Sequence, residues 1–254
     1  MTGNEFKSSG ADPTDSENAE SLTGGSMETA LRGEYAFSPI AMVGASWRLV
    51  KGNKGVLWLA VIVNVLLTMV AEGLLELLLP DTQAMMAEGQ LFEAVGLSMW
   101  VTVLLAPLTA PLTTGICMLN VKRAAGVPAG LAELFAYFGQ VVNLVVLYLL
   151  IWAMWLVGIA LLILPGIYLF VAYQFAVPLM IDKGLSPWQA MEMSRQAVTK
   201  KWFSVFAFNL LLLLILFVSM FTVIGLIWTV PMGALGFGLL YRTIFGFSNR
   251  DAVA

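Results

Sequence analysis

The acidic pair Glu72 and Glu76 is the first candidate for chemistry in this chain. The two carboxylates are four residues apart, so they share one face if the segment is a helix. Acidic side chains inside a membrane span often mark an ion or proton path. The pair lies near the end of an apolar run, where water can also solvate it, so a cation or proton site and a solvated pair are both considered. Asn64, Asn143 and Asn209 are further candidate ligands, or they bond neighbouring helices.

The residue types exclude most familiar active sites. The chain contains no histidine, which excludes a Ser-His dyad and a histidine-ligated metal. One cysteine, Cys117, cannot form a disulfide within the chain or a cysteine-based metal site. The string GALGFG, from Gly233 to Gly238, lacks the order of a nucleotide-binding loop and suits close helix packing. We therefore expect no enzymatic activity, no cofactor and no metal, with an acid dyad at Glu72 and Glu76 as a remote alternative.

The composition predicts an integral membrane protein. Hydrophobic residues make up 59% of the 254 residues and charged residues 11%. A soluble domain is typically about 45–50% apolar and about one quarter charged. The fold class expected is therefore all-α, built from membrane-spanning helices.

The apolar runs are long enough for six transmembrane helices. A span requires about 20 apolar residues. Pro165-Gly166 divides one charge-free run in two and suits the centre of a type II turn. The expected membrane domain covers residues 36–247, with spans at about 55–79, 94–121, 140–164, 166–181, 203–224 and 226–246.

The basic residues predict the orientation, because lysine and arginine are enriched in cytoplasmic loops. They all fall on one side of a six-span chain: Arg48, Lys51, Lys54, Lys122, Arg123, Lys183, Arg195, Lys200, Lys201, Arg242 and Arg250. Both termini are then cytoplasmic. Residues 1–35 carry seven acidic and two basic side chains and predict a disordered acidic tail, while residues 248–254 form a short C-terminal tail.

Two segments that precede spans resemble each other. Both begin with Ser-Pro, at Ser38 and Ser186, and both end with basic residues. Serine suits a helix N-cap and proline the first turn, and Gln189 has the spacing of a capping box with Ser186. A weaker third copy begins at Pro128. These segments predict amphipathic interfacial helices and three repeats, each of one interfacial helix and two spans; chance similarity is the alternative.

The polar stretch from Asp182 to Trp202 contains the candidates for a cytoplasmic contact with a partner. They are Asp182, Trp188, Arg195, Lys200 and Lys201. The orientation rule alone also accounts for the basic residues there.

The stretch from Leu164 to Phe206 combines a Pro-Gly step, an aromatic-rich span, a short acidic-Gly linker and an amphipathic helix with a Ser-Arg pair. It resembles the YciC-like bacterial inner-membrane proteins and is similar to the membrane domain fused to some glycerophosphodiester phosphodiesterases. The matching residues are Pro165, Gly166, Tyr168, Pro178, Asp182, Gly184, Ala190, Ser194 and Arg195. The resemblance implies a six-span inner-membrane protein. It implies no catalytic residue, because the catalytic domain of the fused members is not in this sequence.

Two functions are consistent with these features. The first is a non-enzymatic scaffold, assembly factor or accessory subunit of a membrane complex, with the lipid bilayer and a membrane protein as partners. The alternative is a small transporter or lipid-handling protein with a polar path between helices kinked by proline. Nucleic-acid binding is not expected, since the loops lack a dense basic face.

Overall fold

The computed structural model describes residues 24–79, 82–161 and 163–248, and within these ranges it contains helices and no strands. The predicted all-helical fold is therefore confirmed. Five segments are long and apolar enough to cross a membrane, which supports a multi-pass membrane protein. They are Lys54–Glu76, Leu91–Ala124, Leu131–Gly158, Leu164–Lys183 and Trp202–Met220.

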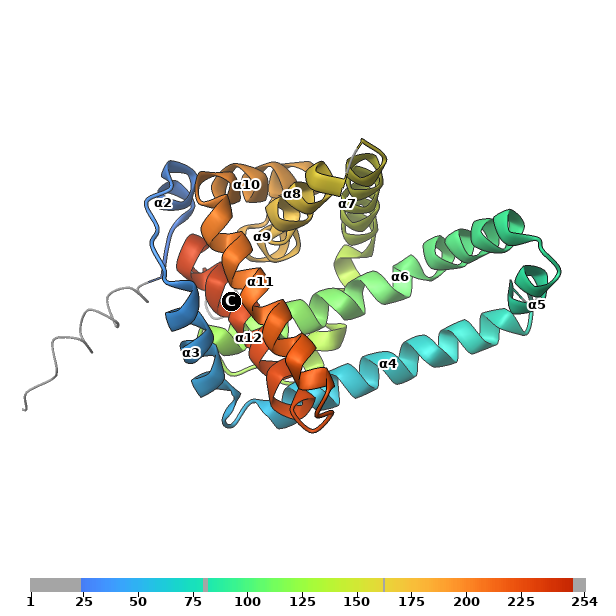
Figure 1. Cartoon of the computed structure of the whole chain (residues 1–254), viewed down its shortest axis with the longest axis horizontal. Helices are drawn as coiled ribbons and strands as arrows, with labels where there is room; N and C mark the ends of the chain where they lie inside the picture. The colour runs from blue at the N-terminus through green and yellow to red at the C-terminus, as the bar shows by residue number, and fades with distance from the viewer. Residues whose placement is uncertain (1–23, 80–81, 162, 249–254) are drawn as a thin grey trace, which may run out of the picture.

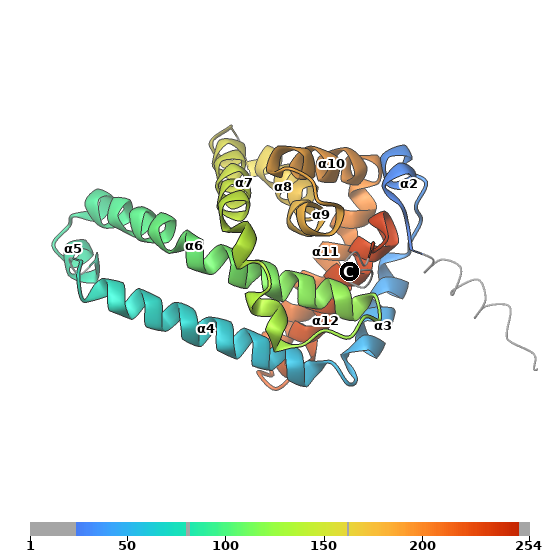
Figure 2. The same ribbon diagram turned by 180° about the vertical axis from the view of Figure 1, so that it is seen from behind.

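A long helical hairpin projects from the rest of the molecule (Figures 1 and 2). Its arms are α4 (Lys54–Glu76) and α6 (Leu91–Ala124), joined through the short α5 (Thr82–Ala87). Helix α6 continues through Pro107 and Pro111 without ending. Large apolar side chains are exposed along the outer halves of both arms, among them Leu66, Met69, Val70, Leu74, Phe92, Met99, Trp100 and Leu104.

Helix α12 (Leu226–Phe245) is the most extensively buried long helix and packs against α2, α3, α4, α6 and α11. Glycine permits two of these crossings. A Cβ at Gly238 would lie 2.6 Å from the Asn120 carbonyl oxygen of α6, and one at Gly236 would lie 2.9 Å from Ser46 Oγ of α3. The expectation that GALGFG serves close helix packing is therefore confirmed. Helix α12 is not among the five candidate spans.

The two Ser-Pro segments form helices with the predicted caps. Helix α3 (Pro39–Val50) begins after Ser38, whose Oγ accepts a hydrogen bond from Ala41 N at 3.5 Å. Helix α10 (Pro187–Lys200) begins with a capping box between Ser186 and Gln189. The third segment forms two short 3-10 helices instead, η1 (Leu131–Phe135) and η2 (Phe138–Gln140). Helix α3 lies along α12 and α11, so it is a packed member of the helical body.

The connection between the third and fourth predicted spans differs from the predicted one. They correspond to α7 (Val141–Leu161), followed by α8 (Ile163–Tyr173) and α9 (Ala176–Lys183). Pro165 and Gly166 lie inside α8, so the type II turn predicted there is wrong. Proline is tolerated in a first helical turn, since its missing N–H has no intrahelical partner there. Gly158 of α7 and Gly166 of α8 allow these two helices to approach closely, because a Cβ at Gly158 would lie 2.9 Å from Gly166 Cα.

Part of the predicted disordered tail, residues 24–35, is folded. Residues 1–23 lie outside the described residues, but 24–35 are folded around α2 (Met27–Arg32). Gly25 N donates to Arg242 O at 3.1 Å, and Tyr35 Oη donates to Ala197 O at 2.9 Å. Composition missed this segment, because its order comes from contacts with α10 and α12. At the other end of the chain, residues 249–254 of the predicted C-terminal tail also lie outside the described residues.

The start of α4 lies beside the connection between α11 (Trp202–Met220) and α12. Trp58 Nε1 donates to Ile227 O at 2.9 Å, and Lys54 Nζ lies 5.0 Å from the Trp228 ring centroid. The predicted orientation places these residues on opposite faces, about 30 Å apart across the hydrocarbon core. The contacts are at odds with that part of the predicted orientation.

Replacing Gly238 by alanine is expected to destabilise the fold by about 1–3 kcal/mol, since the methyl group would be forced against the Asn120 carbonyl. Gly233 in the same helix is the matched control, because its Cβ would lie 3.9 Å from Leu216 Cδ1. Gly233→Ala is expected to be neutral or stabilising by up to about 1 kcal/mol. Thermal unfolding in detergent measures both; equal stability of the two variants would contradict the close crossing.

Membrane-impermeant maleimide labelling tests where the α11–α12 connection lies. Single cysteines are placed at Lys51 and Ile224, both exposed, in a Cys117→Ser background. From the contacts at Trp58 and Lys54, both cysteines are expected to react from the same side of the membrane. A cysteine at Glu88, at the far end of the hairpin, is expected to react from the other side. Labelling of position 224 together with 88 would instead support the predicted orientation.

Candidate functional site

Two apolar cavities flank α7. The larger, about 330 Å³, lies between α7 and the α8–α9 segment; the smaller, about 200 Å³, lies between α7 and α6. Tyr148 and Trp152 line both. The larger is also lined by Ile151, Trp155, Leu169, Phe170, Tyr173, Gln174 and Val177. The smaller is also lined by Met99, Thr102, Val103, Ala106, Thr109, Ala110, Thr113, Val145 and Leu149. Ligand-binding cavities are typically about 300–1,000 Å³ and mostly apolar with a few polar groups.

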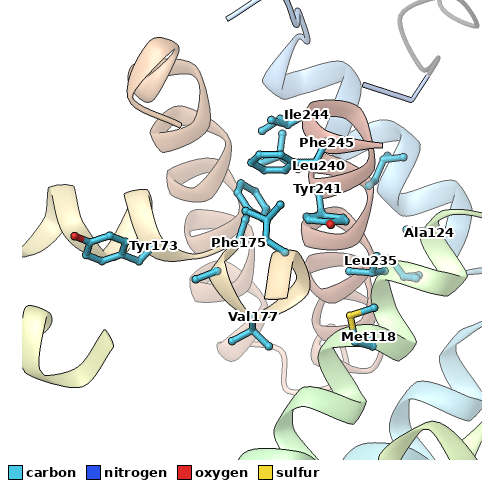
Figure 3. Close-up of a cluster of buried hydrophobic side chains, with 14 of the residues drawn as sticks. Met118, Ala124, Tyr173, Phe175, Val177, Leu235, Leu240, Tyr241, Ile244 and Phe245 are labelled. Carbon is cyan, nitrogen blue, oxygen red and sulfur yellow. The ribbon is translucent and has the colours of Figure 1, made fainter. Parts of the chain in front are cut away.

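The aromatic residues of α7 reach the cavities because of their spacing. Tyr148, Trp152 and Trp155 occupy positions i, i+4 and i+7, which share one face of a helix. Tyr173, at the end of α8, is a buried member of the core cluster, and its side chain points away from Phe175 and Tyr241 (Figure 3). None of these four lining residues was a predicted site residue. The aromatic spacing in YLLIWAMW was a usable signal in the sequence, but the facing helices could not be assigned from it.

Few polar groups border the cavities. Tyr148 Oη lies 3.5 Å from Thr114 Oγ1. Gln174 Oε1 accepts a hydrogen bond from Asn209 Nδ2 at 3.2 Å, while Gln174 Nε2 is buried without a partner. Among the described lining residues there is no carboxylate, lysine, arginine or cysteine. This lining can pack against hydrocarbon and offer an occasional hydrogen bond, but it holds no strong acid or base.

The five predicted ion or ligand residues do not form one cluster. Glu72 and Glu76 are exposed on the projecting arm α4. Asn64, also on α4, is partly buried and its Oδ1 has no hydrogen-bond partner. Asn143 is exposed on α7, and Asn209 of α11 bonds Gln174 beside the larger cavity. The hydrogen bond from Asn209 to Gln174 joins α11 to the α8–α9 segment, which is the helix-bonding role considered for the asparagines.

Asp182 is buried within the chain. Only 5% of the Asp182 surface is exposed. Its carboxylate accepts hydrogen bonds from Tyr241 Oη at 2.8 Å and Ser248 N at 2.9 Å, and forms an ion pair with Lys183 Nζ at 3.0 Å. Lys183 also donates to Gly246 O. This carboxylate ties the end of α9 to the end of α12. A cytoplasmic contact of Asp182 with a partner stays a prediction.

The other predicted contact residues are more accessible. Trp188 is 60% exposed on α10, and Lys200 is exposed near the end of that helix. Lys201 lies 5.7 Å from the Tyr35 ring centroid, so it contacts the N-terminal segment. Whether any of these residues meets a partner stays a prediction.

Arg195 is held by Glu192, to which it donates two hydrogen bonds of 2.9 and 2.6 Å. Hydrogen bonds from Arg195, and then from Gln196, lower the pKa of Glu192 to about 2, so both members of the pair are charged at neutral pH.

The residues that carry the family resemblance have packing roles in this structure. Ser194 Oγ donates to Ala172 O at 2.6 Å and accepts from Phe175 N at 3.3 Å, which fixes the break between α8 and α9. Gly184 ends α9 in a left-handed conformation, with φ of 67°. Tyr168 Oη lies 2.7 Å from Thr199 Oγ1, and Ala190 is fully buried. The pattern therefore describes how α8, α9 and α10 pack.

Replacing Asp182 by alanine is expected to reduce stability by about 3 kcal/mol, because Lys183 and Tyr241 would lose a buried anionic partner. Glu192→Ala is the control, since Glu192 and Arg195 form a partly exposed pair worth less than about 1 kcal/mol. Thermal unfolding in detergent measures the difference. A loss at Asp182 no greater than that at Glu192 would contradict the buried role.

Comparison with known proteins identifies no relative: no family model, no curated protein and no solved structure matches the chain.

Proposed function

We propose that this protein is a non-enzymatic, multi-pass membrane protein that binds the acyl chain of a membrane lipid beside α7. The observation that carries the proposal is the pair of apolar cavities that share Tyr148 and Trp152. Helices apolar enough to span a membrane surround them, so the surrounding solvent is lipid hydrocarbon and not water.

The chemistry of the lining favours hydrocarbon as the ligand. An apolar void forfeits the dispersion contacts of the atoms around it, and such voids stay dry and take up apolar molecules. An ion path would instead require converging charged or strongly polar groups. The polar groups in the otherwise apolar lining are mainly threonine hydroxyls, tyrosine hydroxyls and the Gln174 amide. This lining favours the lipid-handling form of the alternative over ion transport.

A second candidate function is the scaffold or assembly role. It is favoured by the projecting α4–α6 hairpin, whose outer apolar surface is uncovered by the other described residues (Figure 1). Such a surface can pack against a transmembrane helix of another protein, since interhelical packing in lipid depends on close van der Waals contact.

The finer topology remains part of the proposal. Helix α12 has 20 residues, enough for a sixth span, and the basic segments favour a cytoplasmic location for both termini. The contacts of Trp58 and Lys54 favour instead an α11–α12 connection on the side of the membrane where α4 begins. The paired Ser-Pro helices α3 and α10 support two of the three proposed repeats, whereas the third segment forms 3-10 helices. Membership of the YciC-like family, and with it a bacterial inner membrane, rests on the residue pattern from Leu164 to Phe206. The labelling of positions 51, 88 and 224 tests this topology.

Site-specific photo-crosslinking distinguishes the two functions. A photoreactive benzoyl-phenylalanine replaces Trp152 at the cavities, Trp100 on the hairpin or Leu213 on the exposed face of α11. After extraction into detergent, irradiation at position 152 is expected to give a discrete lipid adduct by mass spectrometry, because a lipid held between helices is retained. Position 213 is expected to give no lipid adduct. Equal lipid adducts at positions 152 and 213 would contradict specific lipid binding. A protein adduct formed in cells at position 100 would support the scaffold role.

A further inference from the structure

One aromatic wall separates the two cavities. Tyr148 and Trp152, one helical turn apart on α7, belong to the lining of both. On one side of the wall lie α6 residues such as Val103 and Ala106. On the other side lie α8 residues such as Leu169. The two apolar spaces are therefore neighbours divided by a pair of side chains.

The volumes suit parts of acyl chains. At about 30 Å³ for a water-sized unit, which is close to the size of a methylene group, the cavities of about 330 and 200 Å³ hold roughly eleven and roughly seven such units. Each space thus accepts a segment of one chain and leaves the remainder in the bilayer.

We propose that the ligand is a two-chain lipid that straddles the wall of Tyr148 and Trp152, with one acyl chain in each cavity. The inference rests on the proposed function and specifies its ligand. The covalent link between the chains makes the second insertion intramolecular, so occupancy of the two cavities is coupled. A single-chain lipid has no such link and would occupy them independently.

Cavity-filling variants test this coupling. Ile151→Trp adds bulk to the larger cavity and Ala106→Trp to the smaller, whereas Leu213→Trp adds the same group to an exposed position on α11. Native mass spectrometry compares binding of palmitoyl-oleoyl phosphatidylglycerol with binding of the corresponding single-chain lysolipid. Ile151→Phe and Thr102→Phe repeat the comparison with less added bulk, and size-exclusion profiles report which variants fold.

The wild-type protein and Leu213→Trp are expected to bind one two-chain lipid, and each filling variant is expected to weaken that binding at least tenfold. For the lysolipid, the wild-type protein is expected to bind two molecules and each filling variant one. The inference is overturned if the wild-type protein binds two molecules of the two-chain lipid and each filling variant binds one, although the proposed function would stand. If no filling variant weakens the binding of either lipid, the proposed function itself would be contradicted.

Discussion

The close approach of α12 to α6 and α3 is the constraint on which the rest of this structure depends. Gly238 and Gly236 of α12 have no side chain, so α12 can lie close to Asn120 of α6 and to Ser46 of α3. In a bilayer, lipid tails are as apolar as leucine, so helices associate through tight packing more than through the hydrophobic effect. The crossing fixes α6, and α6 in turn forms one side of the smaller cavity beside α7.

Polar contacts hold the elements around this crossing in place. Asp182 joins the ends of α9 and α12, and Ser194 fixes the break between α8 and α9. The N-terminal segment adds Tyr35, which bonds α10. In contrast, the face of α7 that carries Tyr148 and Trp152 meets its neighbours incompletely, and the cavities lie there. The proposed lipid fills the space that the helices leave open, while the buried polar groups hold the surrounding helices together.

Much of the fold was predictable from the sequence, because it depends on local rules. The apolar runs predicted the long helices, the Ser-Pro steps predicted the starts of α3 and α10, and GALGFG predicted a close crossing. The prediction was wrong at Pro165-Gly166, since proline also suits the first turn of a helix. It was also wrong for residues 24–35, whose order depends on distant contacts with Arg242 and Ala197.

The candidate site was less predictable for a related reason. Charged residues such as Glu72 and Asp182 attract attention in an apolar sequence, yet Glu72 is exposed and Asp182 is a buried anchor. The cavities are lined by ordinary apolar and aromatic residues, and only the mutual placement of α6, α7 and α8 creates them. Determination of the structure in lipid nanodiscs by electron cryo-microscopy tests the central claim most directly. We expect elongated density in the two cavities beside Tyr148 and Trp152. Cavities closed by the surrounding side chains, with no such density, would contradict lipid binding there.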